Sequence, residues 1–192
     1  VVLVCGRRRP QLKRDTLGST VTRWRATVHW SSKARVFWPL LLILLAADCA
    51  TKQLAETYLT PEHIPHEVAG SFVRLTLAHN SGAAMSFSLG RYSRIGFSLA
   101  ALLALILLAQ LYVRTPATHR LRAAALALVV AGALGNLLNR WLSPRGVTDF
   151  IDVGVRSWRF YTFNLADAGI SIGAVLLIVI LSRERSSVKG AA

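Results

Sequence analysis

Residues 145–169, RGVTDFIDVGVRSWRFYTFNLADAG, carry two acidic residues, Asp149 and Asp167, on either side of a predicted change from strand to helix. Apolar residues around Asp149 predict a short strand, namely Val147, Phe150, Ile151 and Val153. An apolar run from Ala166 to Leu181 predicts a helix that begins beside Asp167. A chain that returns from such a strand to such a helix can bring the two carboxylates side by side.

A pair of facing carboxylates has a chemistry of its own. Two such groups repel each other when both are ionised, so one of them keeps its proton. The pair then combines a general base with a general acid, which is the equipment of an aspartic peptidase. A structural alternative remains open on this stretch: Asn164 suits a helix N-cap, and Asp167, three residues later, is a first-turn acid that the helix dipole favours.

The rest of the chain is organised in long apolar runs. Of its 192 residues, 53% are hydrophobic. They gather in four runs, each near the ~20 residues that a membrane-spanning helix requires. We expect spans at about residues 37–58, 95–113, 121–138 and 163–181, within one domain of residues 37–182. The sequence therefore predicts an all-α membrane protein with four transmembrane helices.

Basic residues set the expected topology. The formal net charge is +14, and Lys and Arg gather before Phe37, between Arg114 and Arg122, and after Leu181. Four spans place these three segments on one side of the membrane, so the positive-inside rule predicts that both termini are cytoplasmic. We expect residues 1–36 to form a disordered basic extension and residues 183–192 a cytoplasmic tail. Because topology explains the charge, no nucleic-acid partner is expected.

The first span contains an unusual charge pair. Asp48 and Lys52 are separated by four residues in its outer half, where charges are costly unless they are paired. We expect them to support the structure, with a substrate contact as the alternative. The Asp48-Cys49 sequence resembles the cleavage site of a lipoprotein signal, but the charge of Asp48 and the three later spans favour a retained helix. Cys5 and Cys49 fall in the basic extension and in this span, so no disulfide framework is predicted.

Two further segments carry polar residues near the outer ends of the spans. The loop of residues 60–92 contains a predicted strand at 71–78, followed by Asn80 and by Gly82, which allows close approach of a ligand. In the third span, Gly132, Asn136, Asn139 and Arg140 fall on adjoining helix faces. This pattern predicts a polar pocket. The acids and histidines of residues 62–67 lie in a proline-broken loop without metal-site spacing, so neither a metal nor a cofactor is expected.

Five segments, in this order and with fitting spacing, resemble the lipoprotein signal peptidases (signal peptidase II) of bacteria. They are residues 48–52, 80–84, 132–140, 147–150 and 163–167. The resemblance implies that Asp149 and Asp167 are the catalytic pair. It also implies a substrate site lined by Asn80, Gly82, Asn136, Arg140 and Asn164. A small extracytoplasmic β cradle, built from the two outer loops, is the further expectation for the fold.

The function implied by this resemblance is that of a membrane aspartic endopeptidase in the bacterial cytoplasmic (inner) membrane. Its substrates would be prolipoproteins whose cysteine carries diacylglycerol, cut just before that cysteine at the outer face. We expect membrane lipids as the other partners, and a monomer. The alternative from a different class is a four-helix transporter or scaffold in which buried charges form an ion path.

One position departs from the family pattern, because Asn139 stands where an acid commonly precedes the arginine. Arg140 must then find a carboxylate elsewhere, and Asp149 is the nearest outer candidate in sequence. We predict from this that Arg140 holds Asp149 ionised by lowering its pKa, and that Asp167 is the protonated partner.

Overall fold

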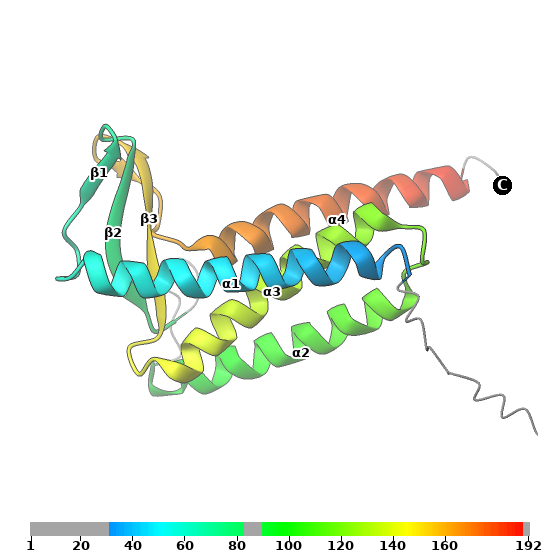
Figure 1. The fold of residues 1–192 in the computed structure, drawn as a ribbon, viewed down its shortest axis with the longest axis horizontal. Helices are drawn as coiled ribbons and strands as arrows, with labels where there is room; N and C mark the ends of the chain where they lie inside the picture. The colour runs from blue at the N-terminus through cyan, green and yellow to red at the C-terminus, as the bar shows by residue number, and fades with distance from the viewer. Residues whose placement is uncertain (1–30, 83–89, 190–192) are drawn as a thin grey trace, which may run out of the picture.

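The structure is a computed structural model, which describes residues 31–82 and 90–189. It contains four long helices, α1 (Ala34–Tyr58), α2 (Ser93–Arg114), α3 (Arg120–Leu142) and α4 (Leu165–Lys189). Each is long and apolar enough to cross a membrane. The helices lie side by side, and a small sheet stands across one end of them (Figure 1). The predicted fold class, a four-helix membrane protein with a small sheet, is confirmed.

Helix α3 is the centre of the bundle, because it contacts each of the other three helices. Small side chains make this possible: Ala123, Ala125, Ala127 and Ala131 are all fully buried. A Cβ atom on Gly132 would collide with the backbone oxygen of Ala166 in α4. Small residues of this kind let membrane helices approach closely. The close α3–α4 contact brings the start of α4 against the outer half of α3.

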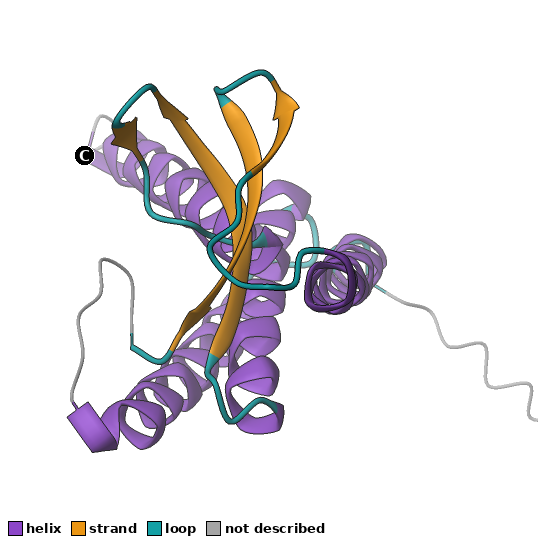
Figure 2. Ribbon diagram, turned by 90° about the vertical axis from the view of Figure 1, so that its left-hand side faces the viewer, coloured by secondary structure: helices purple, strands orange, loops and turns teal. Residues whose placement is uncertain are grey.

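The sheet has four antiparallel strands in the order β1-β2-β3-β4. They are β1 (His66–Ala69), β2 (Val73–Asn80), β3 (Val147–Val155) and β4 (Trp158–Arg159). Strands β2 and β3 come from different loops, one before α2 and one after α3, and they form the middle of the sheet. Figure 2 shows these strands lying across the ends of the helices. In their ladder, Ala78 pairs with Asp149 and His79 pairs with Thr148.

The predicted elements and the structure differ mainly at their ends. Helix α1 begins at Ala34, inside the segment predicted to be a disordered extension, and residues 1–30 lie outside the described part of the chain. Helix α4 begins two residues later than predicted, because Phe163 still pairs with Ile151 of β3. It continues to Lys189 through the predicted tail, and Glu184 on this extension forms an ion pair with Arg122 at 3.2 Å. The strand predicted at 71–78 is present as β2 but lies two residues later, and the strand predicted around Asp149 is present as β3.

Candidate active site

Asn164 is a fully buried residue at the point where the chain leaves the sheet and enters α4. Its side-chain oxygen accepts a hydrogen bond from the backbone N–H of Asp167 at 3.0 Å. In return, the backbone N–H of Asn164 donates to Oδ2 of Asp167 at 3.2 Å. This reciprocal arrangement is a helix capping box. The helix-capping role considered for Asn164 and Asp167 is therefore present in the structure.

The capping contacts do not prevent the two acids from coming together. The side-chain amide of Asn164 also donates to Oδ1 of Asp149 at 2.6 Å, so one residue contacts both carboxylates. Asp149 is 4% exposed and lies in β3, directly beside the first turn of α4. Capping and pairing are thus two parts of a single arrangement, in which the cap holds Asp167 and the same side chain reaches Asp149.

The protonation of this pair is set mainly by burial. Removal of Asp149 from water, together with the negative charge of Asp167, raises the pKa of Asp149 to about 7. Hydrogen bonds from Asn164 and Asn80 favour the anion but are outweighed. Asp149 therefore keeps its proton up to a pH of about 7.

Asp152, three residues further along β3, shows the opposite behaviour. Burial alone would raise its pKa, but hydrogen bonds from Arg159 and Arg74 hold the pKa below its ordinary value. An acid that is matched by two guanidinium groups stays ionised. The raised pKa of Asp149 is thus particular to its place beside Asp167, and is not general to the buried acids of this strand.

Asn136 of α3 connects Asp167 to a second buried charge pair. Its amide donates to Oδ1 of Asp167 at 2.7 Å, and its oxygen accepts a hydrogen bond from Nζ of Lys52 at 2.9 Å. Lys52 also forms an ion pair with Asp48 at 2.8 Å, and both side chains are buried. The other oxygen of Asp48 accepts the backbone N–H of Ala166 at 3.0 Å. The expected supporting role of Asp48 and Lys52 agrees with these contacts.

Arg140 does not behave as predicted. Its guanidinium donates to the backbone oxygen of Gly82 at 3.1 Å and makes no hydrogen bond to Asp149 within the described residues. It lies near enough to Asp149 and Asp167 to interact with both charges. The pKa of Asp149 is nevertheless raised, so the prediction that Arg140 lowers the pKa of Asp149 and keeps it ionised is wrong. Burial and the negative charge of Asp167 outweigh the contacts with Asn164, Asn80 and Lys52, which favour the Asp149 anion.

A cavity of about 630 Å³ opens beside the two carboxylates. Among its lining residues are Asn80, Gly82, Asn136, Arg140, Asp149 and Asp167. Its other walls include aromatic and aliphatic side chains, namely Val147, Phe160, Tyr161, Phe163 and Ile170. A volume of this size, with a few polar groups among apolar walls, is typical of ligand sites. The structure thus brings together six of the seven predicted catalytic and substrate residues at the cavity surface, with Asn164 buried behind them.

Sequence reasoning missed the residues on the opposite side of the β2–β3 ladder. Glu56 of α1 contacts His79 and Thr148, and Asn139 accepts the backbone N–H of Thr148 at 2.6 Å. One signal was available, because Glu56 follows Asp48 and Lys52 at the same four-residue spacing and so lies on the same face of α1. The predicted small-residue segment at 80–84 is only partly described, since Ala83 and Ala84 lie outside the described residues.

Comparison with known proteins agrees with this architecture. The family model for signal peptidase (SPase) II matches residues 40–183. A lipoprotein signal peptidase of Hydrogenovibrio crunogenus is 41% identical over 78% of this chain and 86% of its own length. One from Coxiella burnetii is 36% identical over 82% and 98%. A solved bacterial membrane enzyme superposes with a TM-score of 0.70 at 28% identity, covering 78% of this chain and 88% of its own.

The four-helix membrane bundle and these relatives define the class of the protein, which is a multi-pass bacterial membrane peptidase. The chain belongs to the signal peptidase II family.

The Asp48–Lys52 pair leads to a first prediction. Asp48→Ala or Lys52→Ala alone should each lower stability by about 3–5 kcal/mol, because each leaves one buried charge without its partner. The double change Asp48→Leu and Lys52→Met should be less damaging than either single change. Thermal unfolding of the purified proteins in detergent measures the difference. Cys49→Ala, an exposed neighbour on the same helix, is the control. Equal stability of the single and double variants would rule out charge pairing.

Proposed function

We propose that this protein removes signal peptides from prolipoproteins whose cysteine carries diacylglycerol, cutting just before that cysteine. The observation that carries the proposal is the placement of two carboxylates, the buried Asp149 and the half-buried Asp167, at one cavity where the sheet meets the membrane bundle. A lipid-anchored cysteine would hold its peptide bond near this depth. Family membership and the names of the relatives support the same substrate.

The proposed orientation follows from charge. The start of α1, the α2–α3 connection and the end of α4 lie at the end of the bundle opposite the sheet (Figure 1). These are the segments in which basic residues concentrate. We therefore place that end and both termini in the cytoplasm, and the sheet with the acid pair at the outer face. Both carboxylates come from one chain, so a monomer suffices for this function.

The two acids take different roles in the proposed reaction. Asp167, as the anion, removes a proton from water while the water oxygen attacks the scissile carbonyl carbon. Asp149 gives its proton to the carbonyl oxygen. The C–N bond then breaks, the leaving amine takes the proton from Asp167, and Asp149 recovers a proton as the new carboxylic acid forms. Water supplies both added hydrogens and the added oxygen. Because water is the nucleophile, no covalent bond forms between the protein and its substrate.

The remaining cavity residues hold the substrate in this proposal. Asn80 and Asn136 line the cavity while they hydrogen-bond to Asp149 and Asp167, and Gly82 leaves room for an extended peptide. Nε of Arg140 is buried and has no hydrogen-bond partner among the described residues, so this donor can serve a substrate carbonyl. Phe160, Tyr161 and Ile170 give an apolar surface that suits the lipid chain.

The transporter alternative is not favoured. An ion path requires charged groups on several helices near the middle of the membrane. Between Arg94 and Arg114, helix α2 carries no Asp, Glu, Lys, Arg or His. The acid pair instead lies where the sheet meets the bundle.

The most direct genetic test removes each acid. Asp149→Asn and Asp167→Asn should each lower kcat by about 10²–10⁴-fold, because each change removes one proton-transfer group with little change in shape. Cleavage of a diacylglyceryl-modified precursor peptide by purified, folded protein gives the measurement. Asp152→Asn, on the same strand but outside the cavity, should retain most of its activity. Near-normal activity of Asp167→Asn would leave only the capping role for this residue.

The raised pKa of Asp149 predicts the alkaline side of the pH profile. Below a pH of about 7 Asp149 keeps the shared proton, and above it the proton is lost. The value of kcat/KM should therefore fall above pH 7, by about tenfold for each further pH unit. The measurement uses a substrate without ionisable groups near the scissile bond. Constant activity up to pH 9, with the protein still folded, would contradict the assigned roles.

A further inference from the structure

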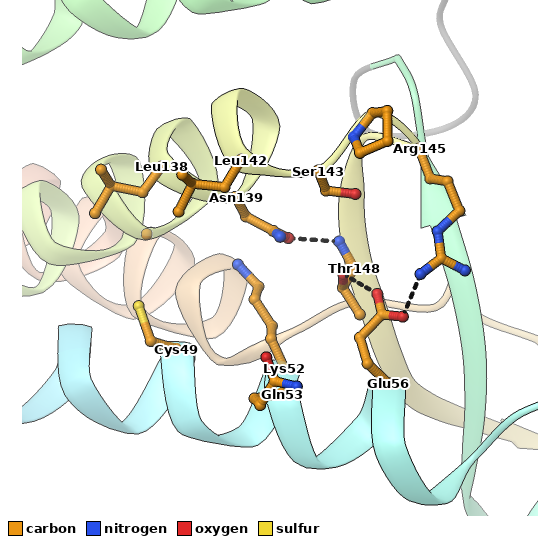
Figure 3. A pocket seen from close by; sticks show the side chains of 12 residues that line it. Cys49, Lys52, Gln53, Glu56, Leu138, Asn139, Leu142, Ser143, Arg145 and Thr148 are labelled. Atoms are coloured by element: carbon orange, nitrogen blue, oxygen red, sulfur yellow. Dashed lines mark hydrogen bonds and ion pairs between the residues drawn. The ribbon is translucent and has the colours of Figure 1, made fainter.

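A polar cluster lies on the other side of the β2–β3 ladder from the acid pair, around Glu56 of α1. One carboxylate oxygen of Glu56 accepts a hydrogen bond from the hydroxyl of Thr148 at 2.8 Å and lies 2.6 Å from Nε2 of His79. The other accepts from Arg145 at 2.6 Å. Figure 3 shows Glu56 reaching from α1 to Thr148 and Arg145 beside a second cavity, of about 560 Å³.

Glu62 closes the cluster from the loop that follows α1. Its carboxylate lies 2.8 Å from Nδ1 of His79, without hydrogen-bond geometry, and 3.4 Å from Arg145. The side chain of His79 is only 5% exposed. Two acids thus enclose a histidine and an arginine, and they connect the end of α1 with the strand β2 and the α3–β3 turn.

Thr148 forms hydrogen bonds through its hydroxyl, its backbone N–H and its backbone oxygen. Its hydroxyl contacts Glu56, its backbone N–H donates to Asn139 at 2.6 Å, and its backbone oxygen accepts the amide of Asn164 at 3.3 Å. In the ladder it lies opposite His79, which contacts the same Glu56. Glu56 therefore contacts two cross-strand neighbours, His79 of β2 and Thr148 of β3.

The next residue on each strand belongs to the candidate active site. Successive side chains of a strand point to opposite faces. Asn80 follows His79, and Asp149 follows Thr148, and both line the cavity that holds the acid pair. His79 also lines this cavity, whereas Thr148 does not. A contact that holds His79 and Thr148 constrains the backbone of both strands, and with it the direction in which Asn80 and Asp149 point.

We propose that Glu56 is a positioning residue, which acts through Thr148 and His79 to hold Asp149 and Asn80 in the geometry needed for peptide cleavage. This inference rests on the proposed catalytic role of Asp149. Helix α1 then orients both acids from one face: Lys52 acts on Asp167 through Asn136, and Glu56 acts on Asp149 through Thr148.

Glu56→Ala and Thr148→Val test this proposal. Each should lower kcat by about 10- to 100-fold, because misplacement of a reacting group by about 1 Å has effects of this size. KM should change less than about twofold, since neither side chain lines the cavity beside the acids. The double variant should be little worse than the single ones, because both remove the same link. Activity is measured per folded molecule, with the precursor peptide as substrate.

The pH profile distinguishes positioning from simple loss of fold. Burial is the main cause of the raised pKa of Asp149. A loosened Asp149 reaches more water, so the alkaline limb of kcat/KM should move to lower pH in Glu56→Ala. Thr148→Ser keeps the hydroxyl, so its kcat and the alkaline limb of its kcat/KM profile should match those of the parent protein. Glu67→Gln, an exposed acid on β1, is the matched control and should behave as the parent protein.

The outcomes separate this inference from the proposed function. If Asp149→Asn is inactive while Glu56→Ala keeps the parent kcat and pH profile, the positioning role is overturned and the peptidase proposal stands. Strictly multiplicative effects of Glu56→Ala and Thr148→Val would also overturn it. If Asp149→Asn itself cleaves at the parent rate, the proposed function fails.

Discussion

The candidate site depends on the hydrogen bonds made by the buried side chain of Asn164. This side chain caps α4 through Asp167 and donates to Asp149, so it joins the sheet to the helix at the place where the two acids meet. A buried carboxylate without hydrogen bonds is costly, and Asn164 satisfies part of that requirement for both acids. The close α3–α4 packing at Gly132 brings Asn136 to the same point.

Charge balance explains why this pair keeps a proton. Lys52 forms an ion pair with Asp48 but still acts on Asp149, and Arg140 is a second positive charge near both acids. With both acids ionised, the buried group would carry a net negative charge, whereas one shared proton makes it neutral. Asp149, on the sheet, is more deeply buried than Asp167 on α4, and this burial raises the pKa of Asp149. The single proton needed for acid–base chemistry is thus a consequence of the fold.

Much of this architecture could be predicted from local pattern. The four apolar runs, the strand around Asp149 and the spacing of Asp48 and Lys52 each depend on neighbours in sequence, and these predictions agree with the structure. The partners of Arg140 and Glu56 could not be obtained in this way. Arg140 bonds to Gly82, and Glu56 bonds to Thr148, in each case across a long stretch of chain. Which distant groups meet depends on how the outer loops fold over the helix ends, and no sequence period encodes that.

The central claim is that Asp149 holds the shared proton, and titration of the carboxyl groups tests it most directly. ¹³C NMR of protein labelled at its aspartate carboxyl carbons, in detergent or lipid discs, would follow each acid against pH, with Asp149→Asn to assign the signal. The account predicts that the Asp149 signal titrates near pH 7, well above an ordinary aspartate. Titration of Asp149 near pH 4, with the protein folded and Asp167 present, would contradict it.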